Sequence, residues 1–154
     1  GGASIGFMHP FTEERARAFW DGILAAVRTG ARALLVVEDA GGICGTVQLV
    51  LALPENQPHR ADLTKMLVHR RARRRGVGAA LVRGAEAVAL EEGRTLLVLD
   101  AVTDGDAARM YARLGWERVG DIPGFALFPD GRVCSTTVFF RHVGEPCGDS
   151  DATA

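Results

Sequence analysis

The spacing of apolar residues along the chain predicts three helices and six strands. Phe19, Ile23 and Val27 belong to a series that recurs every three or four residues, which is typical of an amphipathic helix. Short apolar runs bounded by Gly, Pro and Asp are typical of strands. The predicted helices cover residues 11–29, 79–92 and 106–114, and the predicted strands cover residues 33–38, 43–53, 61–68, 95–101, 116–122 and 134–143.

The order of these elements predicts an α/β (α+β) fold, in which a mixed sheet has helices on both faces. A short Gly-rich segment, residues 39–42, joins the first two strands as a hairpin. Alternation in the third strand places Leu63, Lys65 and Leu67 on one face. We expect turns at residues 123–124 and 129–131 to separate the last two strands.

The composition is that of one globular domain. The chain has 154 residues, of which 47% are hydrophobic and 24% charged, and this excludes disordered and fibrous proteins. We assign residues 1–144 to a single domain and residues 145–154 to a polar tail. The net charge of −1 argues against nucleic acid or an acidic membrane as the partner. No apolar run approaches the ~20 residues of a membrane-spanning helix.

The cysteines and histidines predict neither a disulfide framework nor a metal site. The cysteines Cys44, Cys134 and Cys147 are odd in number and lack the CxxC spacing. The histidines are equally dispersed along the chain. We therefore expect no metal ion and a reducing, cytoplasmic setting.

A basic, glycine-rich segment precedes the second predicted helix. Its residues are Arg73-Arg74-Arg75-Gly76-Val77-Gly78-Ala79. Closely spaced backbone N–H groups at a helix N-terminus favour an anion, the glycines allow close approach, and the arginines add positive charge. We interpret the segment as a cradle for a pyrophosphate. The alternatives are a solvated basic turn and a nucleic-acid-binding patch at Arg70–Arg75.

Two motifs in this order resemble those of the GNAT N-acetyltransferase superfamily. Arg73-x-x-Gly76-x-Gly78 is similar to the family's acetyl-coenzyme A signature, Q/R-x-x-G-x-G/A. The stretch from Asp104 to Trp116 is similar to the family's helix motif, although Asp104 stands where Asn is usual, and both residue types cap helices. The resemblance implies the GNAT fold, with a mostly antiparallel central sheet, and an acetyl-CoA-dependent N-acetyltransferase.

The resemblance also implies which residues hold acetyl-CoA (coenzyme A). In the family, the strand before the glycine-rich loop binds the pantetheine arm through its main chain, and this strand corresponds here to Met66, Leu67 and Val68. The backbone amides of residues 74–79 would bind the pyrophosphate. The helix motif adds Asp104 and Ala107 to the cofactor site.

Acetyl transfer from a thioester to an amine needs a neutral amine and a proton for the departing thiolate. Tyr111, the only tyrosine, is the candidate general acid, because a phenol is protonated at neutral pH. The alternative is that its ring only packs on the sheet. Asp100 ends a buried strand, where burial suits a carboxyl group to accept the proton of the amine. It could equally hold the substrate cation or accept a hydrogen bond from a backbone amide.

The expected acceptor is the amine of a small molecule, with an amino acid or an amino-acid-like antibiotic as candidates. Residues 1–8, 120–125 and 129–132 resemble a branch of the family that acetylates an amino-acid toxin. Phe7, Asp100 and Phe125 are the candidate substrate-binding residues, and the alternative for both phenylalanines is a core position. Two other functions remain open: a non-catalytic acyl-CoA-binding module on the same fold, and a nucleic-acid-binding module that uses the arginine cluster.

Family members normally have a strand and a helix ahead of the point where this sequence begins. We therefore expect a sheet that lacks the family's first strand and helix, or a sheet completed by another chain, with a more open acceptor side. An unpaired edge strand would favour a homodimer.

Overall fold

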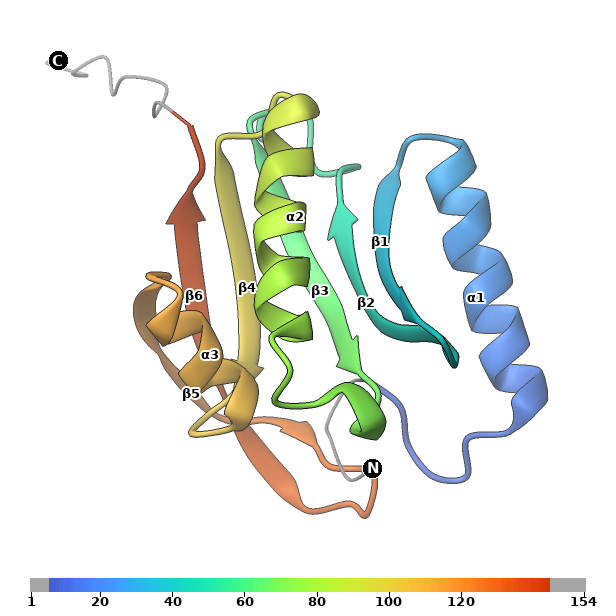
Figure 1. Cartoon of the computed structure of the whole chain (residues 1–154). Helices are drawn as coiled ribbons and strands as arrows, with labels where there is room; N and C mark the ends of the chain where they lie inside the picture. Colours follow the sequence, from blue (N-terminus) through green and yellow to red (C-terminus); the bar gives the residue numbers. More distant parts are fainter. Residues whose placement is uncertain (1–5, 145–154) are drawn as a thin grey trace, which may run out of the picture.

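A six-stranded sheet with the strand order β1-β2-β3-β4-β6-β5 forms the centre of the molecule (Figure 1). β3 and β4 run parallel and all other neighbours run antiparallel, which confirms the predicted mixed, mostly antiparallel sheet with helices. The computed structural model describes residues 6–144, so Cys147 and the predicted tail lie outside the described residues. In chain order the elements are α1 (Glu13–Arg28), β1 (Arg32–Asp39), β2 (Gly42–Val50), β3 (Arg60–Val68), the 3-10 helix η1 (Arg70–Ala72), α2 (Val77–Glu91), β4 (Leu96–Val102), α3 (Asp106–Arg113), β5 (Glu117–Leu127) and β6 (Val133–His142).

The main hydrophobic core lies between the sheet and the two helices α2 and α3 (Figure 1). These helices are short and amphipathic, so each stabilises the fold by burying one apolar face. The central strands contribute every second side chain to the same layer. The buried residues of this core include Val47, Leu49, Ala61, Leu63, Leu81, Val82, Ala85, Leu97, Leu99, Tyr111, Trp116 and Phe139.

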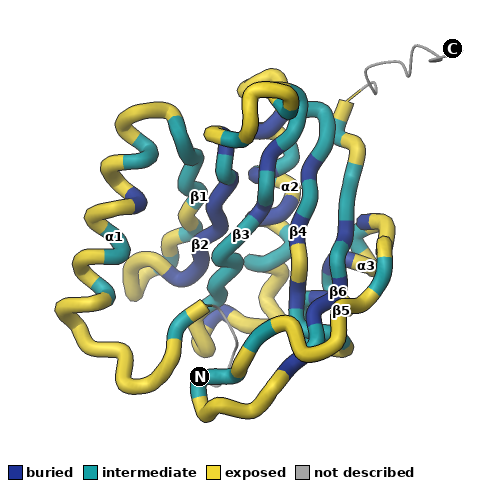
Figure 2. The backbone as a smooth tube through the Cα atoms, turned by 180° about the vertical axis from the view of Figure 1, so that it is seen from behind, coloured by how far each residue is buried: buried dark blue, intermediate teal, exposed yellow. Residues whose placement is uncertain are grey.

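The first helix, α1, lies on the other side of the sheet, beside β1. It begins after Thr12, whose hydroxyl accepts a hydrogen bond from the Arg15 backbone N–H at 3.3 Å. Gly45 lies against α2, so the next side chain, Thr46, points to the opposite face, where Trp20 of α1 lines the same cleft. Seen from behind, α1 lies next to β1 and β2, and no helix of residues 6–144 crosses β3, β4 and β6 (Figure 2).

A β-bulge interrupts β3. The register with β2 pairs Thr64 with Gln48 but Leu67 with Thr46, so β3 carries one more residue than β2 between these two pairs. Lys65 lies in the bulge with a φ of +53°, in the left-handed region that side-chain-bearing residues rarely adopt.

The bulge overturns the alternation expected for this strand. Leu63 and Val68 both pack into the main core, although strict alternation would put them on opposite faces. The expectation that Leu63, Lys65 and Leu67 share one face is therefore wrong. The sequence pattern carries no sign of the extra residue, because a bulge is defined by pairing with the neighbouring strand.

The last two strands also differ from the prediction. β5 continues through Pro123 and Gly124, so the turn expected at these residues does not end the strand. The register with β6 is irregular between Ile122 and Ala126, which accommodates the two residues. β5 is an edge strand, where a proline costs the sheet no ladder hydrogen bond. The turn at residues 129–131 does join the two strands, as expected.

The two edges of the sheet are β1 and β5. Within residues 6–144 no strand precedes α1, so the outer edge of β1 has no strand beside it in the described part of the chain. Such an edge presents backbone groups that a second copy of the chain could pair. The homodimer stays a prediction.

Three further expectations concern membrane helices, cysteine thiols and metal sites. Among the described residues no helix is long and apolar enough to cross a membrane. Cys44 and Cys134 are buried and carry free thiols. In the same part of the chain, no three His, Cys, Asp or Glu side chains are grouped so that they could hold a metal ion.

Gly45 allows α2 to pack closely on β2. A Cβ at this position would lie 2.7 Å from Val77 Cγ1 and 3.0 Å from Leu81 Cδ1. We predict that Gly45→Ala lowers the free energy of unfolding by about 1–3 kcal/mol, because the added methyl group overpacks the contact. Urea unfolding followed by circular dichroism measures the change.

Gly120 offers the matched control, since a Cβ there would meet no atom within 4 Å. Gly120→Ala should change the free energy of unfolding by less than about 1 kcal/mol. Equal destabilisation by the two substitutions would contradict the packing role of Gly45.

Candidate active site

Helix α2 begins directly after a glycine in the left-handed conformation. Gly76 is the N-cap, with a φ of +79°, and no side chain caps this end of the helix. The prediction began the helix at Ala79, whereas the structure begins it at Val77 and so places Gly78 in the first turn. The first N–H groups of a helix have no partner within the helix. Such N–H groups are suited to bind an anion, and the pyrophosphate at this helix end stays a prediction.

The arginines before Gly76 place positive charge at this helix end. Arg73 donates from Nε to the carbonyl oxygen of Val68 at 3.4 Å, which connects the loop to the end of β3. Hydrogen bonding to Arg109 lowers the pKa of Asp106 most, and the charges of Arg74 and Arg73 lower it further. Because Asp106 begins α3, the basic loop and the helix motif lie close together.

Gly78 brings the two predicted motifs into contact. A Cβ at Gly78 would lie 2.8 Å from Met110 Sδ. The structure thus gives Gly78 a packing role against α3, and its part in admitting a phosphate stays a prediction. The reason for a glycine at Gly76 is different, because a Cβ there would meet nothing within 4 Å and the left-handed φ alone favours glycine.

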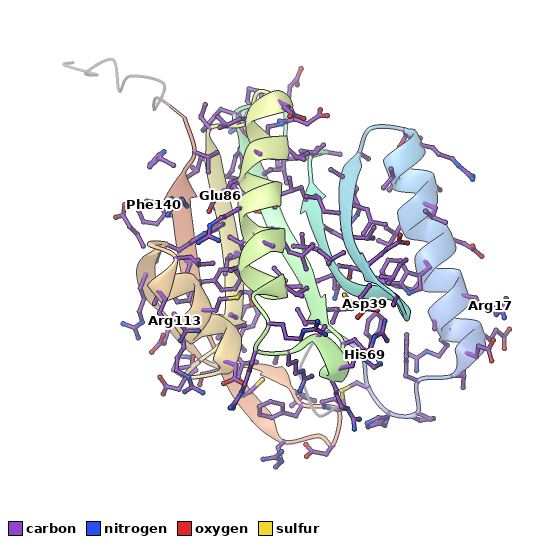
Figure 3. All side chains as sticks on the ribbon, in the orientation of Figure 1. Arg17, Asp39, His69, Glu86, Arg113 and Phe140 are labelled. Carbon is purple, nitrogen blue, oxygen red and sulfur yellow. The ribbon has the colours of Figure 1, made fainter. Side chains whose placement is uncertain are left out.

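Arg71 ties the loop to the β1–β2 hairpin. Its Nε and Nη2 donate to the carboxylate of Asp39 at 3.1–3.3 Å, and Nη2 also donates to the carbonyl oxygens of Gly42 and Ile43 at 3.1 and 3.2 Å. These hydrogen bonds lower the pKa of Asp39. Figure 3 shows Asp39 and His69 at this corner of the molecule. Sequence reasoning did not find this contact, because 32 residues separate the two partners.

The parallel strands β3 and β4 separate after a short paired segment. Their register joins Arg60–Asp62 to Leu96–Val98 and extends no further in the described chain. The segment Met66–Val68 therefore faces β4 without ladder hydrogen bonds. We call this opening between the two strands the split. The residues expected to bind pantetheine thus have backbone groups available on the side that faces β4.

A cleft of about 300 Å³ adjoins this segment and is lined by residues of α1, β2, β3 and the basic loop, including Trp20, Thr46, Met66, Leu67 and Arg73. Thr46 is 7% exposed, and its Oγ1 has no hydrogen-bond partner within residues 6–144. A buried hydroxyl without a partner costs free energy. It therefore suits a ligand that brings a polar group into the cleft.

Tyr111 is buried on the α3 side of the split. It is 3% exposed, and its ring centroid lies 5.5 Å from that of Trp116 and 6.1 Å from that of Phe139. Burial raises the pKa of Tyr111 well above its usual value, and the negative charge of Asp100 raises it further. The ring packs in the core, as one interpretation expected, and the phenol stays protonated, as the general-acid interpretation requires.

Asp100 lies on the opposite side of β4 and is exposed. The expectation that burial suits this carboxyl group to accept a proton is wrong. Both neighbours of Asp100 in the strand face the core, so Asp100 itself faces away from it. Its Oδ2 accepts a hydrogen bond from Thr136 Oγ1 at 2.7 Å. Its charge affects the pKa of both Tyr111 and Lys65, so the three groups lie near one another.

The expected cap of α3 is also wrong. Gly105 is the N-cap and Asp104 makes no capping hydrogen bond. Asp104 instead adopts a φ of +58°, and its carbonyl oxygen accepts a hydrogen bond from Arg109 Nη1 at 2.6 Å. Asn and Asp tolerate this conformation better than other side-chain-bearing residues, which explains the residue preference at this position. Ala107 packs against the main core.

The two aromatic residues expected at the acceptor side have different surroundings. Phe7 contacts Phe11 and Phe19, with ring centroids 4.3 and 4.9 Å away, and the Lys65 ammonium lies 5.1 Å from its ring centre. Phe125 in β5 is 53% exposed. The structure thus places Phe7 against Lys65. Phe125 makes no ring contact with another aromatic residue among residues 6–144.

Comparisons with known proteins agree with these features. A family model described as an acetyltransferase (GNAT) domain matches residues 30–118, which include both motifs and the split. The chain superposes on the putative acetyltransferase YncA of Salmonella typhimurium, solved with its cofactor acetyl-CoA, with a TM-score of 0.73 at 19% identity over 89% of this chain and 78% of that one. For a putative phosphinothricin N-acetyltransferase the TM-score is 0.72 at 22% identity, over 88% and 84% of the two chains. For the ribosomal-protein-alanine N-acetyltransferase of Brucella melitensis it is 0.71 at 22% identity, over 85% and 79%.

At these identities the superpositions show a common fold, whereas the family model covers more than half of the chain. The chain therefore belongs to the GNAT acetyltransferase family and is an acyltransferase that uses acetyl-CoA as its donor.

Proposed function

We propose that this acetyltransferase acetylates the amine of a small molecule and that Tyr111 and Asp100 handle the two proton transfers. The observation that carries the proposal is the split between β3 and β4. A protonated phenol lies on one side of it and a hydrogen-bonded carboxylate on the other. Direct attack of an amine on a thioester requires a proton acceptor and a proton donor in this arrangement.

The residues around the split fit acetyl-CoA, which supplies the acetyl group as a thioester when bound. The first turn of α2 offers uncapped N–H groups to the pyrophosphate, and Arg73 and Arg75 add positive charge. The backbone of Met66–Val68 offers hydrogen bonds to the pantetheine arm. A backbone N–H of Leu67 or Val68 is our candidate for polarising the acetyl carbonyl.

Tyr111 acts as the general acid in this proposal. The packed ring fixes the direction of the phenol, and the raised pKa keeps the phenol protonated at neutral pH, so that a proton is available for the departing thiolate. Asp100 holds the ammonium group of the acceptor and takes its proton. The Thr136 hydroxyl holds the carboxylate in position.

The proton balance of the step is complete. The amine nitrogen forms a bond to the acetyl carbon, and the bond between carbon and sulfur breaks. Before the attack, the ammonium group passes one proton to Asp100, which releases it to solvent. The second proton of the nitrogen goes to Asp100 when the bond to the acetyl carbon has formed, and the sulfur leaves with the proton of Tyr111. Both groups then regain their starting states by exchange with solvent.

A small acceptor is supported by the cleft next to Met66–Val68. Its volume of about 300 Å³ lies at the lower end of the ~300–1,000 Å³ of small-molecule sites. The segments Gly120–Phe125 and Pro129–Arg132 resemble the tabtoxin-resistance protein, an acetyltransferase for an amino-acid-like toxin. We therefore favour an amino acid or an amino-acid-like antibiotic as acceptor, and antibiotic resistance as one possible role. The free thiols of Cys44 and Cys134 fit a cytoplasmic enzyme.

Tyr111→Phe tests the general acid. The substitution keeps the ring contacts and removes the proton, so we predict that kcat falls about a hundredfold or more while KM for acetyl-CoA is unchanged. Wild-type kcat should not fall as the pH rises to 10.0, the ordinary pKa of a tyrosine, because burial raises the pKa of Tyr111. Thiol release in the presence of an amine panel gives kcat. An unchanged kcat in a stably folded variant would exclude the role.

Asp100→Asn tests the carboxylate. We predict a lower kcat, a higher KM for the amine and an altered rise of kcat with pH, because the amide neither accepts the proton nor attracts the ammonium group. Thr136→Val is the companion variant, since it keeps the carboxylate and removes the hydroxyl that donates to Asp100 Oδ2 and to the carbonyl oxygen of Ala101. A pH profile identical to that of the wild type in Asp100→Asn would remove this residue from the role of base.

A further inference from the structure

Lys65 is the only lysine of the chain. The other 17 of the 18 basic side chains are arginines. The one lysine lies within the apolar end of β3, directly before Met66, which we place against the acetyl donor. Motif matching does not find this residue, because it belongs to neither of the two motifs.

The β-bulge turns Lys65 toward the acceptor side of the sheet. Its φ of +53° costs free energy that a regular strand would not incur. The positive charge of Arg32 affects the pKa of Lys65, and the Arg32 guanidinium binds Gln48 on the face opposite α2. Lys65 therefore points to the same face as Asp100.

The surroundings hold the ammonium group closely. It lies 5.1 Å from the ring centre of Phe7, within the range of a cation–π contact. A Cβ at Gly6 would lie 2.6 Å from Lys65 Nζ, so Gly6 makes room for the group. Burial lowers the pKa of Lys65, the charge of Arg32 lowers it further, and that of Asp100 raises it.

Two opposite charges thus flank the split on its acceptor side. The last residue of β4 that pairs with β3 is Val98, and Asp100 follows it by two positions. The last residue of β3 that pairs with β4 is Asp62, and Lys65 follows it by three positions. A zwitterionic amino acid presents an ammonium group and a carboxylate a few ångströms apart. Its ammonium group matches Asp100, and its carboxylate matches Lys65.

We propose that Lys65 is a substrate-binding residue that holds the carboxylate of the acceptor, so that the enzyme acts on amino acids in preference to simple amines. This inference rests on the proposed function, to which it adds the residue that recognises the carboxylate of the acceptor. An ammonium group carries three N–H donors, and a carboxylate oxygen accepts hydrogen bonds from such donors.

The experiment compares each of the twenty coded amino acids with its carboxamide as the acceptor. The carboxamide keeps the amine but replaces the carboxylate with a neutral group. For the wild type we expect kcat/KM to favour the acid by about tenfold to a hundredfold, the range of a charged hydrogen bond. In Lys65→Met this preference should disappear, mainly through KM of the acid, while KM for acetyl-CoA and activity on the carboxamide persist.

Two variants serve as controls. Lys65→Arg keeps a positive charge at the bulge and cannot act as a base, so it should retain part of the preference for the acid. Arg83→Met removes an exposed positive charge from α2, on the other face of the sheet, and should leave the preference unchanged. Thermal unfolding shows whether each variant is folded.

The possible outcomes separate the inference from the proposed function. If amines are acetylated but Lys65→Met leaves the ratio of acid to carboxamide unchanged, the inference about Lys65 is wrong and the proposed function stands. If Lys65→Met and Lys65→Arg lose kcat equally on acids and carboxamides, Lys65 takes part in proton transfer and is not a carboxylate anchor. If no amine of the panel is acetylated by the folded wild type, the proposed function fails and the inference with it.

Discussion

The site depends on one constraint, which is that β3 and β4 are parallel neighbours that pair over only three positions. A parallel pair needs a crossover connection, and here α2 provides it and packs on the same strands. The strands then part, and the unpaired backbone would be costly if it were buried without partners. The fold therefore creates a place where a ligand can take up the hydrogen bonds that the sheet leaves unused.

Several other features lie beside this opening. The bulge in β3 moves Lys65 and Met66 out of the regular alternation, and α3 packs Tyr111 into the core against Trp116 and Phe139. A Cβ at Gly78 of α2 would lie 2.8 Å from Met110 Sδ of α3, so the two helices approach closely at this point. The two family motifs lie far apart in sequence and meet at this contact.

Local signals in the sequence were sufficient for most of the fold. Helical periodicity found α1 to within two residues at its start. The bulge at Lys65, the continuation of β5 through Pro123 and the contact between Arg71 and Asp39 depend on which strands become neighbours, so no local pattern reveals them.

The same limit applies to the candidate site. The motifs found the basic loop and Tyr111, because their residue types and spacing are themselves the signal. The exposure of Asp100 depends on which face of β4 the helices leave uncovered, and a single strand does not show this. The role of Lys65 was invisible for the same reason, although its being the only lysine was visible from the start.

Arg74 illustrates a trade between stability and charge. It adopts a φ of +58° two residues before Gly76, the N-cap of α2. This conformation costs a side-chain-bearing residue about 1–2 kcal/mol relative to the right-handed one. Glycine would adopt the same conformation without this cost. A chain selected only for thermal robustness would therefore favour glycine at this position. In the proposed cofactor site this arginine adds a permanent cation beside the pyrophosphate, so the strain of the loop would benefit the ligand rather than the fold.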